Sequence, residues 1–398
     1  MRILFVSPYP ISRIRVRSYG FVTRLTRQHE VKVLALCTGK QEANDVREVQ
    51  RCGISVTAVQ DSRFAQYLRS LLALGTHDPL QLAFTASTAW RHALQRLLST
   101  ERFDVLHIES MRALACLPGR LPLPSVWDAV DCISQLYELG ARSGATLMMR
   151  CLGSYEARRA RSCEARQLRR FQQVLVTSER ERLALLDTVA LSKSGGHAPI
   201  NVLTHGVDRG YFHTYHGPRQ ADLLVFSGKM SFHANVAGAL HMVKHILPRI
   251  WSQRPNTRLV IAGAHPPLAL RKLARDPRIE ITGYRPDLRP YLARAQVAVC
   301  PLPYAVGVQN KALEAMAMGT PVVATSCVAA GLPVVAGRDL LVADEPEAFA
   351  NAVLHLLEDG AYREQLAHQG LAYINTYHDW DHIIQELIAI YQNAVQNN

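Results

Sequence analysis

The chain has 398 residues, more than one ordinary hydrophobic core organises, so two domains are expected. Apolar residues make up 48% and charged residues 20%, which excludes a disordered chain. The net charge is +12, and residues 1–200 hold 28 Lys and Arg against 17 Asp and Glu, so the basic excess lies almost wholly in the first half. That half suits an anionic partner, such as a phospholipid surface or a lipid-linked phosphate; a solvated Arg-rich surface is the alternative.

Several other classes of protein are excluded or disfavoured. The sequence has no zinc finger, aromatic-basic RNA motif or basic zipper, so no nucleic acid partner is expected. The eight cysteines form no Cys-x-x-Cys pair, which predicts buried free thiols in a reducing compartment and no zinc site. No apolar run approaches the ~20 residues of a membrane span. We therefore expect a cytoplasmic protein, either free or docked on the cytoplasmic face of a membrane.

The first half alternates between strand and helix patterns, as a parallel α/β sheet does. Strands are predicted at residues 2–7, 31–36, 54–59, 104–108, 125–128 and 174–177, and helices at 18–28, 88–98 and 147–171. The last helix is rich in arginine and carries Met148, Leu152 and Tyr155 at helical spacing. We expect this apolar face to pack against the protein while the arginines are solvated; a helix that lies on a membrane is the alternative.

A loop-like composition at residues 206–221 predicts a linker, after which a second α/β series begins. Its predicted strands are residues 223–227, 258–262, 279–282, 297–301 and 321–325. Its predicted helices are residues 236–251, 268–274, 288–293, 309–318, 346–358 and 380–396. The fold class is therefore α/β, with two open sheets in series.

One loop and helix of the second series indicate an anion site. Residues 301–307 leave the carboxyl end of a predicted strand, where open parallel sheets bind ligands, and a helix begins near Gln309. A helix N-terminus offers free N–H groups to a phosphate, and Gly307 lets the backbone approach it closely. Lys311 opposes the helix dipole, so it is better placed facing an anion. Glu314 lies among Ala and Met residues, and its oxygens suit a ribose diol; an exposed glutamate in a salt bridge is the alternative.

A family resemblance rests on segments that follow one another in the expected order. Residues 309–324 resemble the donor-site signature of the retaining GT-B glycosyltransferases, glycosyltransferase family 4. The other matching segments are similar to the family's first-domain strand exit, linker, Gly-Arg/Lys loop and nucleobase loop, in the order 176–179, 201–212, 225–229 and 281–285. The Gln-Asn-Lys variant at 309–311 and the Pro-Tyr-Pro start at 8–10 resemble a subgroup associated with exopolysaccharide gene clusters.

The resemblance implies two Rossmann-like domains that face a cleft. The acceptor-side domain would span residues 1–205 together with the C-terminal helix at 380–398, which crosses back onto it, and the nucleotide-sugar-binding domain would span 206–379. The implied reaction is a retaining sugar transfer from a UDP- or GDP-sugar to a lipid-linked, polysaccharide or small-molecule acceptor. No cofactor and no essential metal are implied, since basic groups and backbone dipoles stabilise the leaving diphosphate.

Carried residue by residue, the resemblance assigns the donor site to the second domain. Gly228 with Lys229 matches the diphosphate contact, and Gly307 with Val308 matches the backbone N–H pair at the phosphates. Glu314 matches the ribose carboxylate.

Two further sets of residues complete this donor site. Tyr284 and Arg285 match the loop that frames the base. The family often carries a first glutamate at the position of Val306, so we expect Gln309, Asn310 and Lys311 to take over its sugar and phosphate contacts.

The first domain departs further from the family. Its first loop has arginines where the family has a Gly-Gly pair, so Arg17 is assigned to the diphosphate, which a guanidinium binds bidentately. Glu109 stands where many relatives place an active-site histidine, and it joins Lys229 and Glu314 as a catalytic assignment.

Three acceptor-side assignments are weaker. His107 lies on the same side of its strand as Glu109, with a core histidine as the alternative. Asp131 suits an acceptor hydroxyl or a helix cap, and His205 replaces the family's asparagine at the linker.

Other functions remain open at this point. A non-catalytic sugar-nucleotide-binding or assembly subunit fits the missing glutamate and the altered first loop. A UDP-sugar 2-epimerase has the same two-domain shape, but its signature does not match residues 309–314. A dinucleotide oxidoreductase is disfavoured because no G-x-G-x-x-G follows the first strand.

Overall fold

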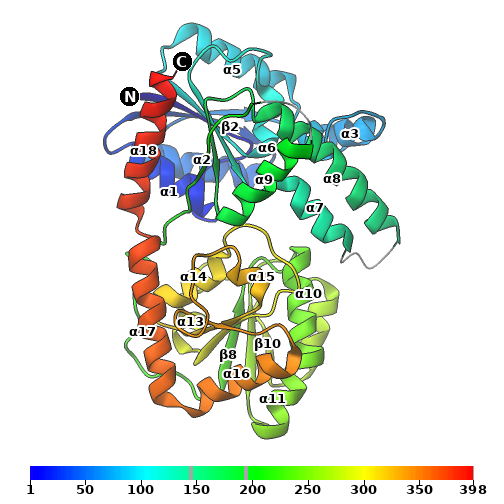
Figure 1. Ribbon diagram of the computed structural model, residues 1–398, viewed down its shortest axis with the longest axis vertical. Helices are drawn as coiled ribbons and strands as arrows, with labels where there is room; N and C mark the ends of the chain where they lie inside the picture. The colour runs from blue at the N-terminus through cyan, green and yellow to red at the C-terminus, as the bar shows by residue number, and fades with distance from the viewer. Residues whose placement is uncertain (143–146, 192–195, 398) are drawn as a thin grey trace. The chain divides into compact units, whose positions relative to one another are not determined.

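The computed structural model describes residues 1–142, 147–191 and 196–397 (Figure 1). The chain divides into two compact units, the first formed by Met1–Gly206 with Trp380–Asn398 and the second by Val207–Asp379. Each unit is built on one parallel sheet with helices packed against it.

The sheet of the first unit has the strand order β3-β2-β1-β4-β5-β6-β7, and all of its described pairings are parallel. Its central strands β1 and β4 are buried along almost their whole length, because helices cover both faces of a parallel sheet. Strand order reverses between β1 and β4, so their carboxyl ends open the crevice where such sheets bind ligands. The strands are β1 (Arg2–Ser7), β2 (Glu30–Cys37), β3 (Ser55–Gln60), β4 (Val105–Glu109), β5 (Ser125–Val130), β6 (Gln173–Val176) and β7 (Ile200–Val202).

The helices of the first unit include one from the far end of the chain. Helix α18 lies beside α1 because Gly20 and Gly206 make room for the Trp380 indole (Figure 1). A β-carbon at Gly20 would come 2.1 Å from that ring, and one at Gly206 would come 2.6 Å from it. The helices are α1 (Val16–Leu25), α2 (Lys40–Arg51), α3 (Arg63–Leu72), α4 (Leu80–Phe84), α5 (Thr88–Thr100), α6 (Ser110–Ala113), α7 (Ile133–Arg142), α8 (Leu147–Gln167), α9 (Glu179–Leu191) and α18 (Trp380–Gln396), with 3-10 turns at Ala73–Gly75 and Leu114–Cys116.

Helix α8 corrects one expectation from the sequence. Met148, Leu152 and Tyr155 are 77%, 45% and 44% exposed, so the apolar face predicted to pack against the protein faces solvent. Another side of the helix packs against the unit: Gly153 lies against Ala141 of α7, and Glu156 accepts the backbone N–H of Leu80 at 2.8 Å. Small residues such as Ala157 make the close contacts there, and they gave no apolar periodicity.

The second unit repeats the same strand order, β10-β9-β8-β11-β12-β13, again with parallel pairings. The strands are β8 (Leu223–Ser227), β9 (Arg258–Ala262), β10 (Ile279–Ile281), β11 (Val297–Cys300), β12 (Val322–Ala324) and β13 (Leu341–Val342). The helices are α10 (His233–His241), α11 (Leu247–Gln253), α12 (Leu268–Arg271), α13 (Arg289–Arg294), α14 (Asn310–Ala317), α15 (Ser326–Ala329), α16 (Pro346–Glu358) and α17 (Gly360–Tyr377); a π turn at Met242–Ile246 joins α10 to α11, and a 3-10 turn at Lys272–Arg275 follows α12.

Three further observations bear on the sequence expectations. All eight cysteines are free, as predicted, but Cys52 and Cys151 are exposed and not buried. Among the described residues, no helix is long and apolar enough to cross a membrane. No three His, Cys, Asp or Glu side chains in those same ranges are grouped so as to hold a metal ion.

Candidate functional site

The switch point of the second sheet lies between β8 and β11, where the strand order reverses. Gly228 and Lys229 follow β8, and the loop 301–307 follows β11. Parallel strands bring both loops to the same edge of the sheet, so the diphosphate candidates Gly228, Lys229 and Gly307 share the edge where open α/β sheets bind ligands.

At this edge, the backbones of two glycines come into direct contact. Gly228 has a φ of 147° and Gly263, after β9, has a φ of 154°. A β-carbon at Gly263 would lie 1.7 Å from the carbonyl oxygen of Gly228, so only glycine fits there. Gly263, directly after the predicted strand 258–262, was not among the predicted site residues.

Helix α14 contributes the charged groups of the donor site. The Cε atom of Lys311 lies 3.2 Å from where a β-carbon at Gly228 would stand, so the lysine chain passes directly by this glycine. Its Nζ donates to Oε1 of Gln309 at 3.1 Å, and Nε2 of Gln309 donates to the carbonyl of Val306 at 2.8 Å. Of the three predicted residues, Gln309 and Lys311 are therefore joined, and Gln309 anchors the lysine to the preceding loop.

The charges of Lys311 and Glu314 are poorly solvated. Burial lowers the pKa of Lys311 below its usual value. Burial raises the pKa of Glu314 to about 7, although the Lys311 charge acts in the opposite direction. Groups with such shifts, one turn apart at a sheet's binding edge, are typical of a ligand site. No ion pair joins them among the described contacts, which argues against the surface salt bridge considered for Glu314.

Asn235 supports the loop after β8. Its Nδ2 donates to the carbonyl of Lys229 at 3.0 Å, which holds the loop while the Lys229 side chain is exposed to solvent. Its Oδ1 is buried and accepts no hydrogen bond within the described part of the chain. Asn235 was not a predicted site residue, because a single asparagine before the predicted helix 236–251 gives no motif.

The predicted base-framing loop lines a cavity of about 410 Å³ beside the ends of β9 and β10. Tyr284 is exposed at its rim, Gly283 has a φ of 66°, and Oγ1 of Thr282 accepts the N–H of Gly263 at 3.2 Å. The cavity thus adjoins the glycine pair. Arg285 follows Tyr284 and is also exposed, but it does not line this cavity.

The loop after β11 is held at both ends. Gly307 has a φ of 61°, and a β-carbon at Gly331 would lie 2.4 Å from its carbonyl oxygen. The Tyr304 hydroxyl lies 2.6 Å from Nδ1 of His233, and their rings stack. Val308 and Asn310 continue this loop into α14. Tyr304 and His233 were not predicted site residues, since their pairing depends on two loops that only the fold brings together.

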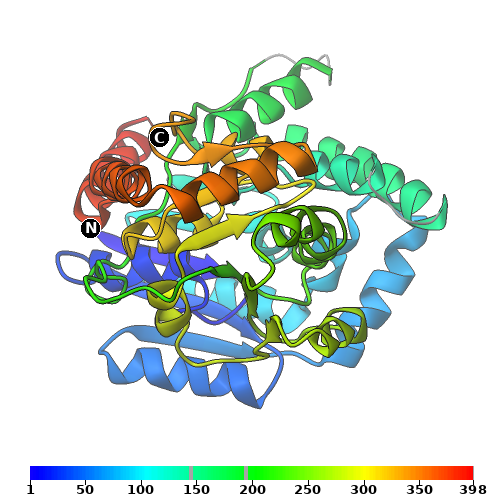
Figure 2. The same cartoon turned by 90° about the horizontal axis from the view of Figure 1, so that it is seen from below.

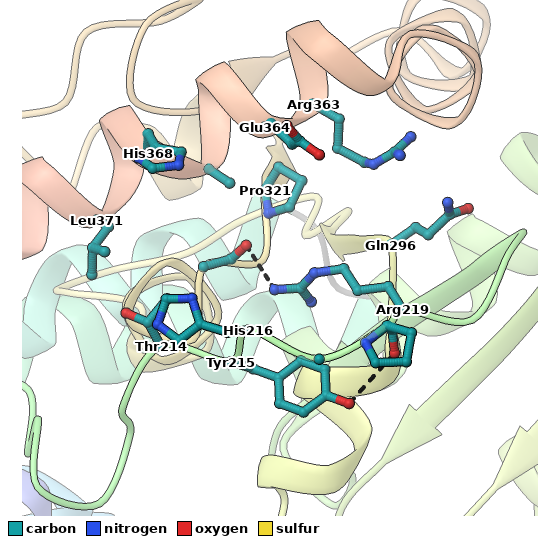
Figure 3. Close-up of a pocket in the computed structure, with 14 residues that line it drawn as sticks. Thr214, Tyr215, His216, Arg219, Gln296, Pro321, Arg363, Glu364, His368 and Leu371 are labelled. Carbon is teal, nitrogen blue, oxygen red and sulfur yellow. Dashed lines mark hydrogen bonds between the residues drawn. The ribbon is translucent and has the colours of Figure 1, made fainter.

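A larger hollow of about 470 Å³ lies elsewhere in the second unit (Figure 3). Its residues Arg219, Gln296 and Pro321 precede β8, β11 and β12, so it lies at the edge where the strands begin. The Arg219 guanidinium donates to several backbone carbonyls, including that of Gly319 at 2.8 Å. This hollow is therefore separate from the donor residues, which follow the strands.

In the first unit, Glu109 ends β4 at the switch point. Its Oε1 accepts the Ser18 hydroxyl at 2.7 Å and the Tyr9 hydroxyl at 3.4 Å. Its Oε2 has no hydrogen-bond partner among the described residues, and burial raises the pKa of the carboxyl. Ser110 follows with a φ of 64°, a strained conformation that tends to occur at functional sites.

Arg17 has a different role from the predicted diphosphate contact. Its guanidinium is buried, donates to both carboxylate oxygens of Asp128 at 2.7 and 3.0 Å, and also reaches the carbonyls of Leu203 and Thr204. Because its N–H groups donate to oxygens inside the protein, Arg17 is a structural residue. Its predicted contact with the diphosphate of the sugar donor is therefore wrong. Arg13, in the loop that precedes α1, is exposed and keeps an accessible guanidinium.

The structure also decides between the two roles considered for His107. Its ring is fully buried, stacks on Phe5 with centroids 4.2 Å apart, and Nδ1 lies 2.9 Å from the Tyr391 hydroxyl of α18. His107 is therefore the core histidine that the sequence left as the alternative, and the acceptor role is wrong. His205 is also buried, directly before the Gly206 that faces Trp380.

Asp131 belongs to a group of carboxylates around the start of α7. Glu164 accepts the backbone N–H groups of Ile133 and Ser134 at 2.8 and 3.2 Å, and Glu181 accepts that of Cys132. These two carboxylates therefore occupy the capping positions that were the alternative role for Asp131. Burial, followed by the Glu181 charge, raises the pKa of Asp131.

Comparison with known proteins connects this geometry to a family. Residues 221–359, within the second unit, match the family model described as Glycosyl transferases group 1. No curated protein sequence matches the chain.

Solved structures match both units. The HepE protein of Anabaena in complex with UDP is 15% identical, with a TM-score of 0.68 over 98% of this chain and 100% of that chain. Sucrose-phosphate synthase of Thermosynechococcus elongatus is 14% identical, with a TM-score of 0.72 over 100% of both chains. A glycosyltransferase of Rickettsia africae is 13% identical, with a TM-score of 0.65 over 100% of this chain and 99% of that chain. The predicted GT-B fold is thereby confirmed. Together with the match of residues 221–359, it supports a transferase enzyme, as predicted.

Proposed function

We propose that this glycosyltransferase moves a sugar from a UDP- or GDP-sugar, with retention of configuration, to a lipid-linked, polysaccharide or small-molecule acceptor in polysaccharide biosynthesis. The observation that carries the proposal is the close approach of Lys311 to Gly228, with Glu314 one turn further along α14. The structures of HepE in complex with UDP and with UDP-glucose support a nucleotide-sugar donor.

Binding of a nucleoside diphosphate would offset the unfavourable burial of the Lys311 and Glu314 charges. A diphosphate above Gly228 would compensate the Lys311 charge, which burial makes costly. Hydroxyls of a ribose would donate to Glu314 and favour its carboxylate form. The cavity beside Tyr284 would receive the base, and the N–H groups of Gly307 and Val308 would face the phosphates.

The chemistry follows from these positions. When the bond between the anomeric carbon and the diphosphate breaks, its electron pair leaves on the diphosphate. Lys229, Lys311 and the backbone N–H groups would stabilise that charge without a metal ion. Gln309 and Asn310 would hold the sugar in place of the glutamate replaced by Val306. The acceptor oxygen would bond to the anomeric carbon, and Glu109 would take its proton through the unpaired Oε2.

Nucleotide binding by a Glu314→Ala variant tests the donor site. We expect the natural protein to bind UDP or GDP by calorimetry, and the variant to lose at least about tenfold in affinity while its unfolding temperature stays nearly the same. Glu347→Ala is the matched control, because Glu347 is exposed on α16 of the same unit. Equal affinities of the natural protein and the Glu314 variant for both nucleotides would reject the assignment.

A turnover assay with a panel of UDP- and GDP-sugars tests the reaction. Transfer, or slow release of nucleotide from the donor, is expected with retention at the anomeric carbon. Inversion at that carbon would overturn the retaining assignment, and epimerised nucleotide-sugar in place of released nucleotide would overturn the transfer reaction.

A further inference from the structure

Helix α3 turns an apolar face to solvent. Phe64, Tyr67, Leu68, Leu71 and Leu72 recur at the three- and four-residue spacing of one helix face, and they are 44% to 76% exposed. The opposite face holds Gln66, which is 3% exposed. The helix is therefore amphipathic in the opposite sense to an ordinary surface helix, whose apolar stripe faces the core.

The start of α8 continues this face. Leu147 and Met148 are each 77% exposed, and Leu152 and Tyr155 follow on the next turns. The Tyr155 hydroxyl donates to the carbonyl of Leu74 at 3.2 Å, which joins α8 to the turn after α3. Both views place α3 and α8 on the same side of the first unit (Figures 1 and 2).

We call this the α3–α8 surface: the exposed apolar side chains of residues 64–74 and 147–155. It contains ten of the twenty large apolar side chains that are exposed in the described part of the chain. Soluble proteins rarely gather exposed apolar side chains in this way unless a partner covers them.

The charges around the surface are basic. Arg63, Arg150 and Arg158 are exposed among the apolar side chains, and none of them forms an ion pair within the described residues. The two segments contain no Asp or Glu, and four acids that lie near them in the sequence are already paired with arginines, as Asp61–Arg69, Asp78–Arg166, Glu138–Arg161 and Glu156–Arg159. An anionic partner would therefore meet unopposed guanidinium groups.

We propose that the α3–α8 surface docks the protein on a bilayer that contains anionic phospholipid. Leucine and aromatic side chains would enter the boundary between headgroups and acyl chains, while the arginines would bind the phosphates. A protein interface would have few charges within its apolar centre, whereas here the exposed Arg63 of α3 and Arg150 of α8 lie beside exposed apolar side chains, which favours lipid. Docking of this kind needs no spanning helix.

This inference goes beyond the donor site and does not depend on it. The surface lies in the first unit, whereas the nucleotide residues lie in the second. Vesicle binding can therefore be measured without nucleotide, and UDP or GDP binding can be measured without vesicles, so failure of one proposal is distinct from failure of the other.

Co-sedimentation of the full chain with vesicles tests the proposal. We expect binding to phosphatidylcholine vesicles that contain phosphatidylglycerol, weaker binding to phosphatidylcholine alone, and loss of binding as salt is added. The double variant Leu71→Gln/Leu72→Gln should bind about tenfold more weakly, because it removes apolar area from the membrane contact. Leu183→Gln is the control, since Leu183 is 51% exposed on α9 of the same unit.

A second variant separates charge from apolar contact. Arg150→Gln/Arg158→Gln should lose about 25-fold in affinity for anionic vesicles, at roughly fivefold per arginine, and change little on neutral ones. The control is Arg47→Gln on α2, an exposed arginine outside the surface. Equal binding by the natural protein and both double variants would overturn the proposal. The proposal would also be overturned if the natural protein bound no vesicles and formed a dimer that the Leu71→Gln/Leu72→Gln variant does not form. A second copy of the chain would then cover the surface.

Discussion

The carbonyl oxygen of Gly228 lies 1.7 Å from where a β-carbon at Gly263 would stand. This contact brings the ends of β8 and β9 together at the edge of the second sheet that holds the donor residues. Since no side chain can enter between them, the backbone itself forms the floor on which we place the diphosphate.

Gly263→Ala should therefore both destabilise the protein and abolish nucleotide binding. The methyl group must displace the Gly228 backbone, and the φ of 154° is strained for alanine, so we expect a loss of about 3 kcal/mol in unfolding free energy. Gly337→Ala is the control, because Gly337 has a φ of 80° with open space around it and should cost only about 1 kcal/mol. Urea titration measures both. Equal losses would show that the close contact does not matter.

Nucleotide affinity should depend on the protonation of Glu314. Burial raises the pKa of its carboxyl to about 7, and the ribose hydroxyls would bind its charged form. The affinity should therefore fall as pH decreases from 8 through about 7 to 5, and binding at pH 7 should release protons. Calorimetry in two buffers of different ionisation enthalpy measures that release. A Glu314→Gln variant should bind weakly with no such pH dependence, and an equally steep dependence in this variant would place the titrating group elsewhere.

The buried pair of Arg17 and Asp128 should be a large contributor to stability. Arg17→Met leaves a buried carboxylate without its partner, so the unfolding free energy should fall by about 4 kcal/mol. Arg182→Met, which breaks the exposed pair with Glu179, should cost less than about 1 kcal/mol. Burial alone would raise the pKa of Asp128, but the Arg17 guanidinium lowers it to about 2.

The sign of the acid dependence follows from that lowered pKa. The folded protein holds the Asp128 proton less tightly than the unfolded chain, whose value is near 3.8. The pair therefore stabilises the fold fully above that pH, and its contribution is lost as pH falls toward 2. The difference in unfolding free energy between the natural protein and Arg17→Met should shrink over that range, and a difference that stays constant down to pH 2 would contradict the assignment.

Glu164 should act in the opposite direction and at higher pH. Burial raises the pKa of this carboxyl from 4.5 to about 7, so the folded protein binds its proton more tightly than the unfolded chain does. Its effect destabilises the fold as pH rises from about 4.5 to 7, by up to about 3 kcal/mol. Glu164→Gln should flatten the loss of unfolding temperature between pH 5 and pH 8. A calorimetric slope that matches the natural protein would disprove this.

Glu109 should affect the rate of sugar transfer but not the affinity for the nucleotide of the donor. If its unpaired Oε2 takes the acceptor proton, Glu109→Gln should lower kcat by about a hundredfold and leave UDP or GDP affinity unchanged. Ser18→Ala should have a smaller effect, because it removes only one hydrogen bond to Oε1. A normal kcat in Glu109→Gln would remove the residue from the reaction.

The sequence alone predicted those elements and sites whose residues lie close together in the chain. Strand patterns such as residues 2–7 and 223–227 predicted the observed bounds, because a buried parallel strand is a short continuous apolar run between turn residues. Helix α2 was missed because it has few apolar positions, and α9 was missed because its apolar residues do not gather on one face. The donor loop from Gly307 to Glu314 could be recognised because its glycine, lysine and glutamate are close together in the chain.

Contacts between distant segments required the fold. The sequence could not show that Arg17 meets Asp128 or that His107 meets Tyr391, because 111 and 284 residues separate these partners. The exposure of Met148 and Leu152 was likewise decided by which side of α8 packs against the unit and not by their spacing. Periodicity indicates which side chains share a face, but only the tertiary structure determines whether that face meets a neighbouring element or the solvent.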